Sequence, residues 1–221
     1  MNFALVPVKA LAGGKSRLST VLPQEARQAV SRAMLTDVLT CLRRSSSVNK
    51  FAVVSSDDAL LSLAKEFGAS IIHEGQPRGL SGAIALGTDF CVEQGATALL
   101  VLLADLPLVE PEDVNFLFRQ SEEIDQGVVL ATCKEREGTN ALLRVPPRVI
   151  PPCFGGPSLE WHRAAAQRVG AQFRVVEAPR LAFDIDSVED LQQLLSRPSH
   201  TETYRVLKAI DGLQNFFGIG K

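Results

Sequence analysis

The sequence of 221 residues lacks a C-x-x-C pair, a long apolar stretch and a strong excess of either charge. Its four cysteines lie far apart, which argues against a zinc site or a disulfide framework and favours free thiols in a reducing compartment. A net charge of −2 argues against nucleic acid as the main partner. No apolar run approaches the roughly 18 residues of a membrane span, and the N-terminal residues lack a signal peptide's charged leader. We therefore expect a cytoplasmic protein that binds neither nucleic acid nor membrane.

The first half of the chain alternates short apolar runs with segments of helical periodicity. We expect buried strands at 3–8, 51–54, 71–72 and 98–103. We expect helices at 24–44, 57–67 and 81–94, and a further helix that begins at Pro111. Four strand–helix repeats predict an α/β fold with a mostly parallel sheet and helices on both faces, in three layers.

The second half has a looser rhythm. Strands are expected at 128–132, 140–145 and 173–176, and helices at 158–168 and 187–195. No repeat or linker interrupts residues 1–197, which we interpret as one domain. Residues 198–221 predict an amphipathic extension that packs on this domain or on a partner subunit, so a homodimer is one expectation.

The loop at residues 9–18 (KALAGGKSRL) follows the first strand, at the sheet edge where α/β proteins bind ligands. Gly13 and Gly14 let backbone N–H groups approach phosphate oxygens, and Lys15 and Arg17 supply positive charge. The loop lacks the first glycine of a P-loop and does not match a dinucleotide fingerprint. A flexible turn with solvated cations is the alternative interpretation.

Asp105 follows the most hydrophobic strand, and Pro107 prevents that strand from continuing. A carboxylate at this place is either desolvated at a cost or paired with a cation. The sequence thus indicates an acid presented to a ligand, with a helix cap or a simple turn as the alternative.

Asp184 and Asp186 are a second source of carboxylates. In an extended segment both would lie on one face, opposite Ile185. Carboxylates that converge near phosphates suit Mg²⁺, which prefers oxygen ligands. The alternative is that Asp186 or Ser187 caps the next helix, whose first residues have capping-box spacing.

Two further segments are candidate substrate loops. Residues 138–141 (GTNA) precede a strand, and residues 154–158 (FGGPS) form a glycine-proline turn before a helix, whose N-terminus attracts anions. Ordinary tight turns are the alternative for both. His162 has no metal-ligand spacing and is interpreted as structural, with a position facing a substrate loop as the alternative.

Five motifs in order resemble the 2-phospho-L-lactate guanylyltransferase and phosphoenolpyruvate guanylyltransferase family of coenzyme F-420 biosynthesis, over residues 3 to about 195. The motifs are Val6-Pro7-Val8-Lys9 with Lys15-Ser16-Arg17-Leu18; Arg78-Gly79-Leu80; Leu103-Ala104-Asp105-Leu106-Pro107; Gly138-Thr139-Asn140-Ala141-Leu142; and Phe154-Gly155 with Ser158 and His162, followed by Asp184-Ile185-Asp186. The family's second motif continues with asparagine, where this sequence has Ser81.

The resemblance implies a Rossmann-like fold of the GT-A nucleotidyltransferase type and a bound Mg²⁺. It implies metal ligation by Asp105 and Asp186, with Asp184 as a third candidate, and catalytic roles for Lys15, Arg17 and Asp105. The residues expected to contact the nucleotide are Val8, Lys9, Gly13, Gly14, Lys15, Gly79 and Leu80. The residues expected to contact the acceptor are Thr139, Asn140, Gly155 and Ser158.

The implied reaction transfers GMP from GTP to a three-carbon phospho-acid and releases pyrophosphate. The acceptor is phosphoenolpyruvate, 2-phospho-L-lactate or 3-phosphoglycerate, and the motifs do not distinguish these three. One alternative is a nucleotidyltransferase of the same fold that acts on a sugar phosphate or on the molybdenum cofactor. Another is a nucleotide-binding module without turnover.

Overall fold

Seven strands form one sheet in the computed structural model, which describes residues 1–11 and 15–218. The spatial order is β3-β2-β1-β4-β6-β5-β7. The strands are β1 (Asn2–Pro7), β2 (Lys50–Ser55), β3 (Ser70–His73), β4 (Ala98–Leu102), β5 (Gly127–Thr132), β6 (Thr139–Val145) and β7 (Gln172–Val176). Each overlaps an expected strand, and the prediction of an α/β fold with a mostly parallel sheet is confirmed.

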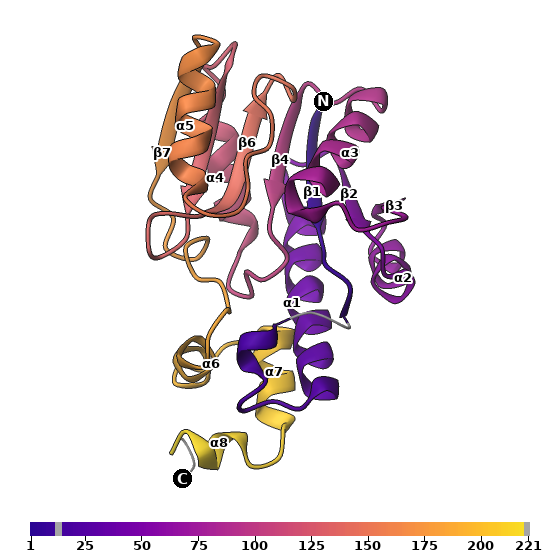
Figure 1. Cartoon of the computed structure of the whole chain (residues 1–221), viewed down its shortest axis with the longest axis vertical. Helices are drawn as coiled ribbons and strands as arrows, with labels where there is room; N and C mark the ends of the chain where they lie inside the picture. Colours follow the sequence, from indigo (N-terminus) through magenta and orange to yellow (C-terminus); the bar gives the residue numbers. More distant parts are fainter. Residues whose placement is uncertain (12–14, 219–221) are drawn as a thin grey trace.

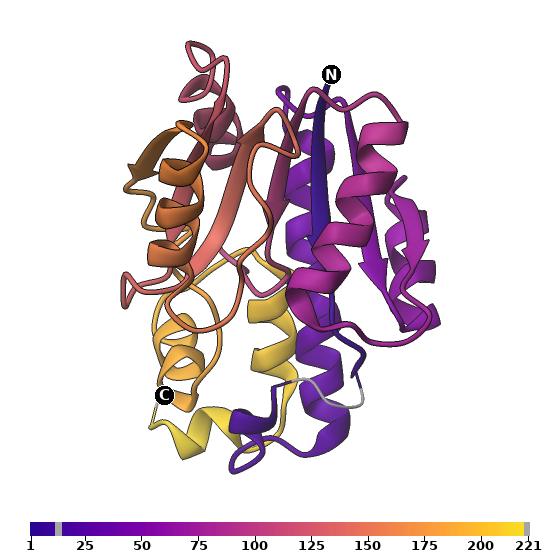
Figure 2. The same cartoon turned by 45° about the horizontal axis from the view of Figure 1, so that its top comes forward.

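Helices cover both faces of this sheet (Figure 1). They are α1 (Gln24–Arg44), α2 (Asp58–Glu66), α3 (Gly79–Glu93), α4 (Pro111–Arg119) and α5 (Ser158–Arg168). Alternation along β1 separates two cores, because Ala4 and Val6 pack with α1, α2 and α4, whereas Phe3 and Leu5 pack with α3 and α5. Figure 2 shows α3 and α5 in front of the sheet and α1 behind it. The three layers therefore follow from period-two alternation.

Strand β6 runs against the direction of its neighbours. It pairs antiparallel with both β4 and β5, while β1, β2, β3, β4, β5 and β7 share one direction. The short connection from β5 to β6 explains the reversal, because a parallel neighbour needs a long crossover. As a result, Thr139 at the start of β6 lies beside the carboxyl end of β4, where the backbone N–H of Leu103 donates to the carbonyl of Asn140.

The C-terminal segment forms a third cluster below the sheet. Its helices are α6 (Val188–Leu195), α7 (Glu202–Ala209) and α8 (Leu213–Phe216), and a short helix η2 (Ser16–Leu18) packs with them. Figure 1 shows α7 alongside the lower half of α1. Asp37 of α1 accepts hydrogen bonds from the backbone N–H groups of Glu202 and Thr203 and from the Thr203 hydroxyl. Leu18, at the end of the first loop, is buried in the same apolar cluster as residues of α6, α7 and α8. The first loop therefore packs against the C-terminal helices.

The strand order reverses at β1. The chain winds from β1 to β2 and β3 on one side, and then crosses back through α3 to β4 on the other side of β1. Ligands of open α/β sheets bind outside the carboxyl ends of the strands at such a switch point. The ends of β1 and β4 are therefore the place to look for a site. Within the described part of the chain, no helix combines the length and the apolarity needed to cross a membrane.

Candidate active site

A cavity of about 540 Å³ lies at the carboxyl ends of β1 and β4. Its volume is within the range of small-molecule sites, roughly 300 to 1,000 Å³. The predicted site residues that line it are Val8, Lys9, Lys15, Arg17, Leu80, Asp105, Thr139, Asn140, Gly155, Ser158, Asp184 and Asp186. Gly79 precedes Leu80 but does not line the cavity, and Gly13 and Gly14 lie outside the described residues.

A second hollow, of about 600 Å³, lies against α5. Its lining residues are Cys153, Trp161, Ala164, Gln167 and Arg168. Arg168 is the one charged side chain among the described residues that line it, so this hollow lacks the opposed charges of the first. The first cavity is therefore the candidate active site.

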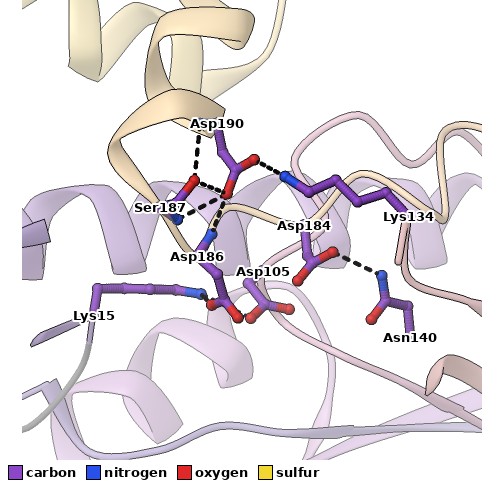
Figure 3. Close-up of polar contacts among 8 residues, drawn as sticks. All are labelled: Lys15, Asp105, Lys134, Asn140, Asp184, Asp186, Ser187 and Asp190. Carbon is purple, nitrogen blue, oxygen red and sulfur yellow. Dashed lines mark hydrogen bonds and ion pairs between the residues drawn. The ribbon is translucent and has the colours of Figure 1, made fainter. Parts of the chain in front are cut away.

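Lys15 reaches from the first loop to two carboxylates on distant segments. Its Nζ lies 2.8 Å from Asp105 Oδ2 and 2.8 Å from Asp186 Oδ1 (Figure 3). Burial by itself would lower the pKa of Lys15, but the charges of both carboxylates and the hydrogen bonds to them outweigh burial, so its pKa is raised. Lys15 therefore stays charged. Its backbone is left-handed (φ 52°), which is uncommon for a residue other than glycine.

Asp105 lies just after the end of β4 and lines the cavity. Its Oδ2 accepts from Lys15, while its Oδ1 is buried and has no hydrogen-bond partner among the described residues. The Asp105 backbone carbonyl accepts from the backbone N–H of Ile185, at 3.2 Å, and this bond joins the segment at 184–186 to the end of β4. No helix begins at Asp105, since α4 starts at Pro111. The alternative of a helix cap is thus excluded, whereas Asp105 does lie in a turn, as the other alternative expects.

Asp184 is half-buried, and Asn140 holds its carboxylate. Asn140 Nδ2 donates to Asp184 Oδ1, at 3.1 Å, and to the carbonyl of Leu181, at 2.9 Å. Burial raises the pKa of Asp184 to about 6, and the charge of Asp105 adds to this effect. The hydrogen bond from Asn140 acts in the opposite direction without cancelling it. A nearby cation would stabilise the ionised form of this carboxylate.

Asp190 fixes the backbone of residues 186–187. Its Oδ2 accepts from the backbone N–H groups of Asp186 and Ser187 and from the Ser187 hydroxyl. Its other oxygen is paired with Lys134, which follows β5 (Figure 3). Ser187 and Asp190 form the capping box of α6. The cap is thus provided by Ser187, and the carboxylates of Asp184 and Asp186 remain free to face the cavity.

Another part of the cavity lining, formed by two hydroxyl residues, is neutral. Thr139 begins β6 and Ser158 begins α5, and their hydroxyls are 2.9 Å apart. His162 lies behind them with no exposed surface, and its Nδ1 is 3.2 Å from Thr139 Oγ1. Its Nε2 accepts from the backbone N–H of Cys153, at 3.0 Å. Below, Lys15, Asp105, Asp184 and Asp186 are called the acidic side, and Thr139, Ser158 and His162 the hydroxyl side.

The turn before α5 contributes backbone rather than side chains to the hydroxyl side. Gly155 and Gly156 have φ of 96° and 54°, which other residues rarely adopt. A Cβ on Gly156 would also lie 2.7 Å from the Trp161 ring. Ser81 of α3 holds the turn, since its Oγ accepts from the backbone N–H of Phe154, at 2.9 Å. The glycines are therefore required by the shape of this turn.

The acidic side has the chemistry of a site for a hard divalent cation. All of its candidate ligands are carboxylate oxygens, as Mg²⁺ prefers. One of these oxygens, Asp105 Oδ1, is buried and lacks a partner, which fits an oxygen kept for a cation. In the arrangement described for residues 1–11 and 15–218, Lys15 is the cation between Asp105 and Asp186, and no three Asp, Glu, His or Cys side chains form a ready ligand set.

Sequence reasoning missed one contributor, Lys134, which carries no motif and whose contact with Asp190 spans 56 positions. His162 belongs to the fifth motif and is interpreted as structural, with a place facing a substrate loop as the alternative. It lies buried against Thr139 of the cavity wall, 23 positions away. The fifth motif contains both Ser158 and His162, and this was the one sequence signal that His162 lies near the site. Arg17 lines the cavity and is exposed.

Known proteins resemble this chain in sequence and in fold. A family model described as guanylyl transferase CofC like matches residues 2–215. A relative from Rubrobacter xylanophilus, named phosphoenolpyruvate guanylyltransferase, is 43% identical over 192 residues, which cover 87% of this chain and 92% of the relative. A relative from Phenylobacterium zucineum, named 3-phospho-D-glycerate guanylyltransferase, is 34% identical over 211 residues, or 94% of this chain and 95% of the relative.

Solved structures show the fold. A candidate nucleotide-diphospho-sugar transferase from Desulfovibrio desulfuricans superposes with a TM-score of 0.76 at 17% identity, covering 98% of this chain and 97% of its own. At that identity the likeness concerns the fold alone, and it agrees with the predicted Rossmann-like architecture.

Proposed function

This chain belongs to the CofC-like guanylyl transferase family, and from this premise we propose that it transfers GMP from GTP to a three-carbon phospho-acid. The prediction of a nucleotidyltransferase enzyme is confirmed by the family; the donor and the acceptor are the proposal. The observation that carries it is the cavity with two unlike sides, one with three carboxylates and a lysine, the other with neutral donors. A triphosphate with its cation suits the first side, and a small anion suits the second.

The proposed step is a substitution at the α-phosphorus of GTP. A phosphate oxygen of the acceptor forms the new P–O bond, the bond between the α-phosphorus and its bridging oxygen breaks, and pyrophosphate leaves with that oxygen. The attacking oxygen is already anionic at pH 7, so the step needs no general base. The protein's contribution is then to position two anions against each other and to compensate their charge.

The acidic side compensates charge. Asp105 and Asp186, with Asp184 beside them, would hold Mg²⁺, which when bound offsets the negative charge of the phosphates. Lys15 stays protonated in its buried place and can offer its charge to phosphate oxygens. Arg17, exposed at the cavity rim, is proposed to neutralise the departing pyrophosphate. Val8, Lys9 and Leu80 are proposed to contact the nucleotide.

The hydroxyl side binds the acceptor in this proposal. Thr139 and Ser158 offer hydroxyls, Gly155 offers backbone, and Asn140 links this wall to Asp184. Such small groups suit a compact anion with a carboxylate and a phosphate, and they provide little to grip a sugar ring. We propose phosphoenolpyruvate as the first acceptor to test, followed by 2-phospho-L-lactate and 3-phosphoglycerate. The proposal includes a place in coenzyme F-420 biosynthesis and a cytoplasmic location.

The test is a matrix of pyrophosphate release. Four nucleoside triphosphates are each combined with Mg²⁺ and with one of the three acids, and mannose 1-phosphate serves as a decoy acceptor. We expect release with GTP and one or more acids, at least about tenfold above release with the other triphosphates. Turnover with the sugar phosphate and none with the acids would refute the proposed acceptor class. Tight GTP binding without any turnover would instead support a module that only binds nucleotide.

A further inference from the structure

His162 sits at the centre of a buried hydrogen-bond chain that the proposed reaction does not itself use. It has no exposed surface, and it is separated from the cavity by Thr139 and Ser158, which are 4% and 2% exposed. The Phe154 ring packs edge-on against the imidazole, with ring centroids 5.1 Å apart. The ring is thus held in place: Nε2 contacts the Cys153 amide, and Nδ1 lies 3.2 Å from Thr139 Oγ1, with the Ser158 carbonyl as a second neighbour of the imidazole.

The backbone fixes which ring nitrogen carries the proton. The amide of Cys153 can only donate, so His162 Nε2 must accept from it and must be unprotonated. A neutral imidazole then carries its hydrogen on Nδ1, which faces Thr139 Oγ1. Burial lowers the pKa of His162 to about 4, and the charge of Arg144 adds to this, against a smaller opposing effect of the Ser158 carbonyl. Burial and the charge of Arg144 both favour the neutral form of the imidazole at neutral pH.

The hydroxyl hydrogens can now be counted. Thr139 and Ser158 bring one hydrogen each, and one of the two is used in the bond between their oxygens. Because Nδ1 of His162 donates to Thr139, the histidine consumes neither hydrogen. One O–H hydrogen is therefore left over in the pair, and both residues line the cavity.

We propose that His162 is a positioning residue: its Nδ1–H is held on Thr139, so that the Thr139–Ser158 pair presents one spare O–H donor to an anionic oxygen of the acceptor. In the opposite tautomer, His162 Nδ1 would accept the hydroxyl hydrogen of Thr139, and no O–H donor would be left for the acceptor. The histidine thus makes a neutral wall selective for an anion without placing a charge there. The acceptor in this inference rests on the proposed function, whereas the tautomer does not.

The tautomer can be measured without any variant. The protein has three histidines, and the other two, His73 and His200, are exposed. In ¹⁵N-labelled protein, two-bond ¹H–¹⁵N correlation spectra distinguish a protonated ring nitrogen from an unprotonated one. We expect one histidine with Nδ1 protonated and Nε2 unprotonated, and unchanged between pH 8 and about pH 5.5. A protonated Nε2, averaged tautomers or a doubly protonated ring in that range would overturn the proposal.

Two variants separate the two hydrogen bonds of the ring. In His162→Asn the side-chain amide reaches the position of Nδ1 and can still donate to Thr139. In His162→Gln it reaches the position of Nε2 and can accept from Cys153, but nothing donates to Thr139. In the Gln variant the spare O–H of the pair is still present, but nothing holds it toward the acceptor, so we expect KM for the acceptor to rise about tenfold. The Asn variant should stay within about threefold. KM for GTP should be unchanged in both.

The outcomes are distinguishable from those of the proposed function. His200→Asn, at an exposed site, is the matched control, and thermal unfolding shows whether each variant is folded. Equal acceptor KM in both variants, or a defect confined to GTP, would overturn the positioning role. Absence of turnover by the unmodified protein with every acid, together with the Nδ1–H tautomer, would locate the failure in the proposed function. If neither variant folds, the spectra of the unmodified protein decide alone.

Discussion

The acidic side and the hydroxyl side of one cavity are organised by different forces. On the acidic side, Lys15 lies 2.8 Å from each of two carboxylates, and Asp184 has a raised pKa because burial and neighbouring charge act together. On the hydroxyl side, the groups are neutral, and the pKa of His162 is lowered. Charges act over several ångströms, whereas hydroxyl bonds depend on short distances and on the direction of single hydrogens.

This difference predicts how each side responds to change. Removing a charge from the acidic side unbalances a group of charges that compensate one another, so large effects on rate and metal use are expected. Altering the hydroxyl side removes one neutral hydrogen bond at a time, so smaller and graded effects are expected. Four predictions test whether the two sides really differ in this way.

The largest effect is expected on the acidic side at Asp105. Asp105→Asn keeps the shape of the side chain and removes its charge, so turnover should fall at least ~100-fold, about 2.7 kcal/mol in the barrier. The measurement is pyrophosphate release at saturating GTP and acceptor, with thermal unfolding as a test of folding. Asp125→Asn, at an exposed loop before β5, is the control and should leave turnover unchanged. Near-normal turnover by Asp105→Asn or Asp186→Asn would remove that residue from the site.

The strands and helices could be predicted because their signals are local. The boundaries of α1 at 24–44 follow from a 3.6-residue period and from Pro23 in front of it. Asp57, the first residue of the helical segment expected at 57–67, accepts from the N–H groups of Ala59 and Leu60 and so caps α2. The direction of β6 had no such signal, because strand direction depends on pairing and not on the strand's own residues.

The residues of the candidate site also differ in whether their signal is local in the sequence. Isolated acids after apolar runs, such as Asp105, stand out in a sequence because burying a charge is costly. Lys134 and His162 do not stand out, because each acquires its role from one partner far along the chain. The capping box at Ser187 was visible, but not that its acid, Asp190, also pairs with Lys134. The order of the motifs was enough to predict the residues of the acidic side. The directions of the hydrogen bonds on the hydroxyl side follow only from the three-dimensional structure.

A second test of the acidic side concerns Lys15. Lys15→Ala removes a charge that we expect to meet the triphosphate, so kcat/KM for GTP should fall roughly 30-fold, within the range of charge-assisted hydrogen bonds. KM for the acceptor should change little. Separate titrations of GTP and acceptor measure the two effects, and Lys65→Ala on the exposed end of α2 is the control. A defect that appears only in the acceptor titration would mean that the first loop serves the hydroxyl side.

A smaller effect is expected from the support of the acidic side. Lys134→Gln removes the partner of Asp190, whose other oxygen holds the backbone of Asp186. Groups that orient metal ligands contribute about tenfold or more to metal affinity. We therefore expect about tenfold weaker Mn²⁺ binding in a direct titration, with turnover recovered at high Mg²⁺. Lys134→Arg keeps the charge and should restore binding. Unchanged metal affinity with lowered turnover at every Mg²⁺ concentration would contradict this role.

The smallest effect tests the neutrality of the hydroxyl side through the pH dependence of stability. Burial, with the charge of Arg144, lowers the pKa of His162 in the folded protein to about 4, while an unfolded histidine has a pKa near 6.5. Between these values the unfolded chain binds more protons than the folded one, so the free energy of unfolding falls as pH falls through this window and is unaffected above it. From pH 6 to pH 5 this loss is about 1 kcal/mol. Urea unfolding of the unmodified protein should show that extra loss relative to His162→Asn and His162→Gln, neither of which titrates at this position. A parallel pH dependence in all three proteins would mean that His162 has the same pKa in the folded and unfolded states. The hydroxyl side would then carry a positive charge below that pKa, in conflict with a neutral wall.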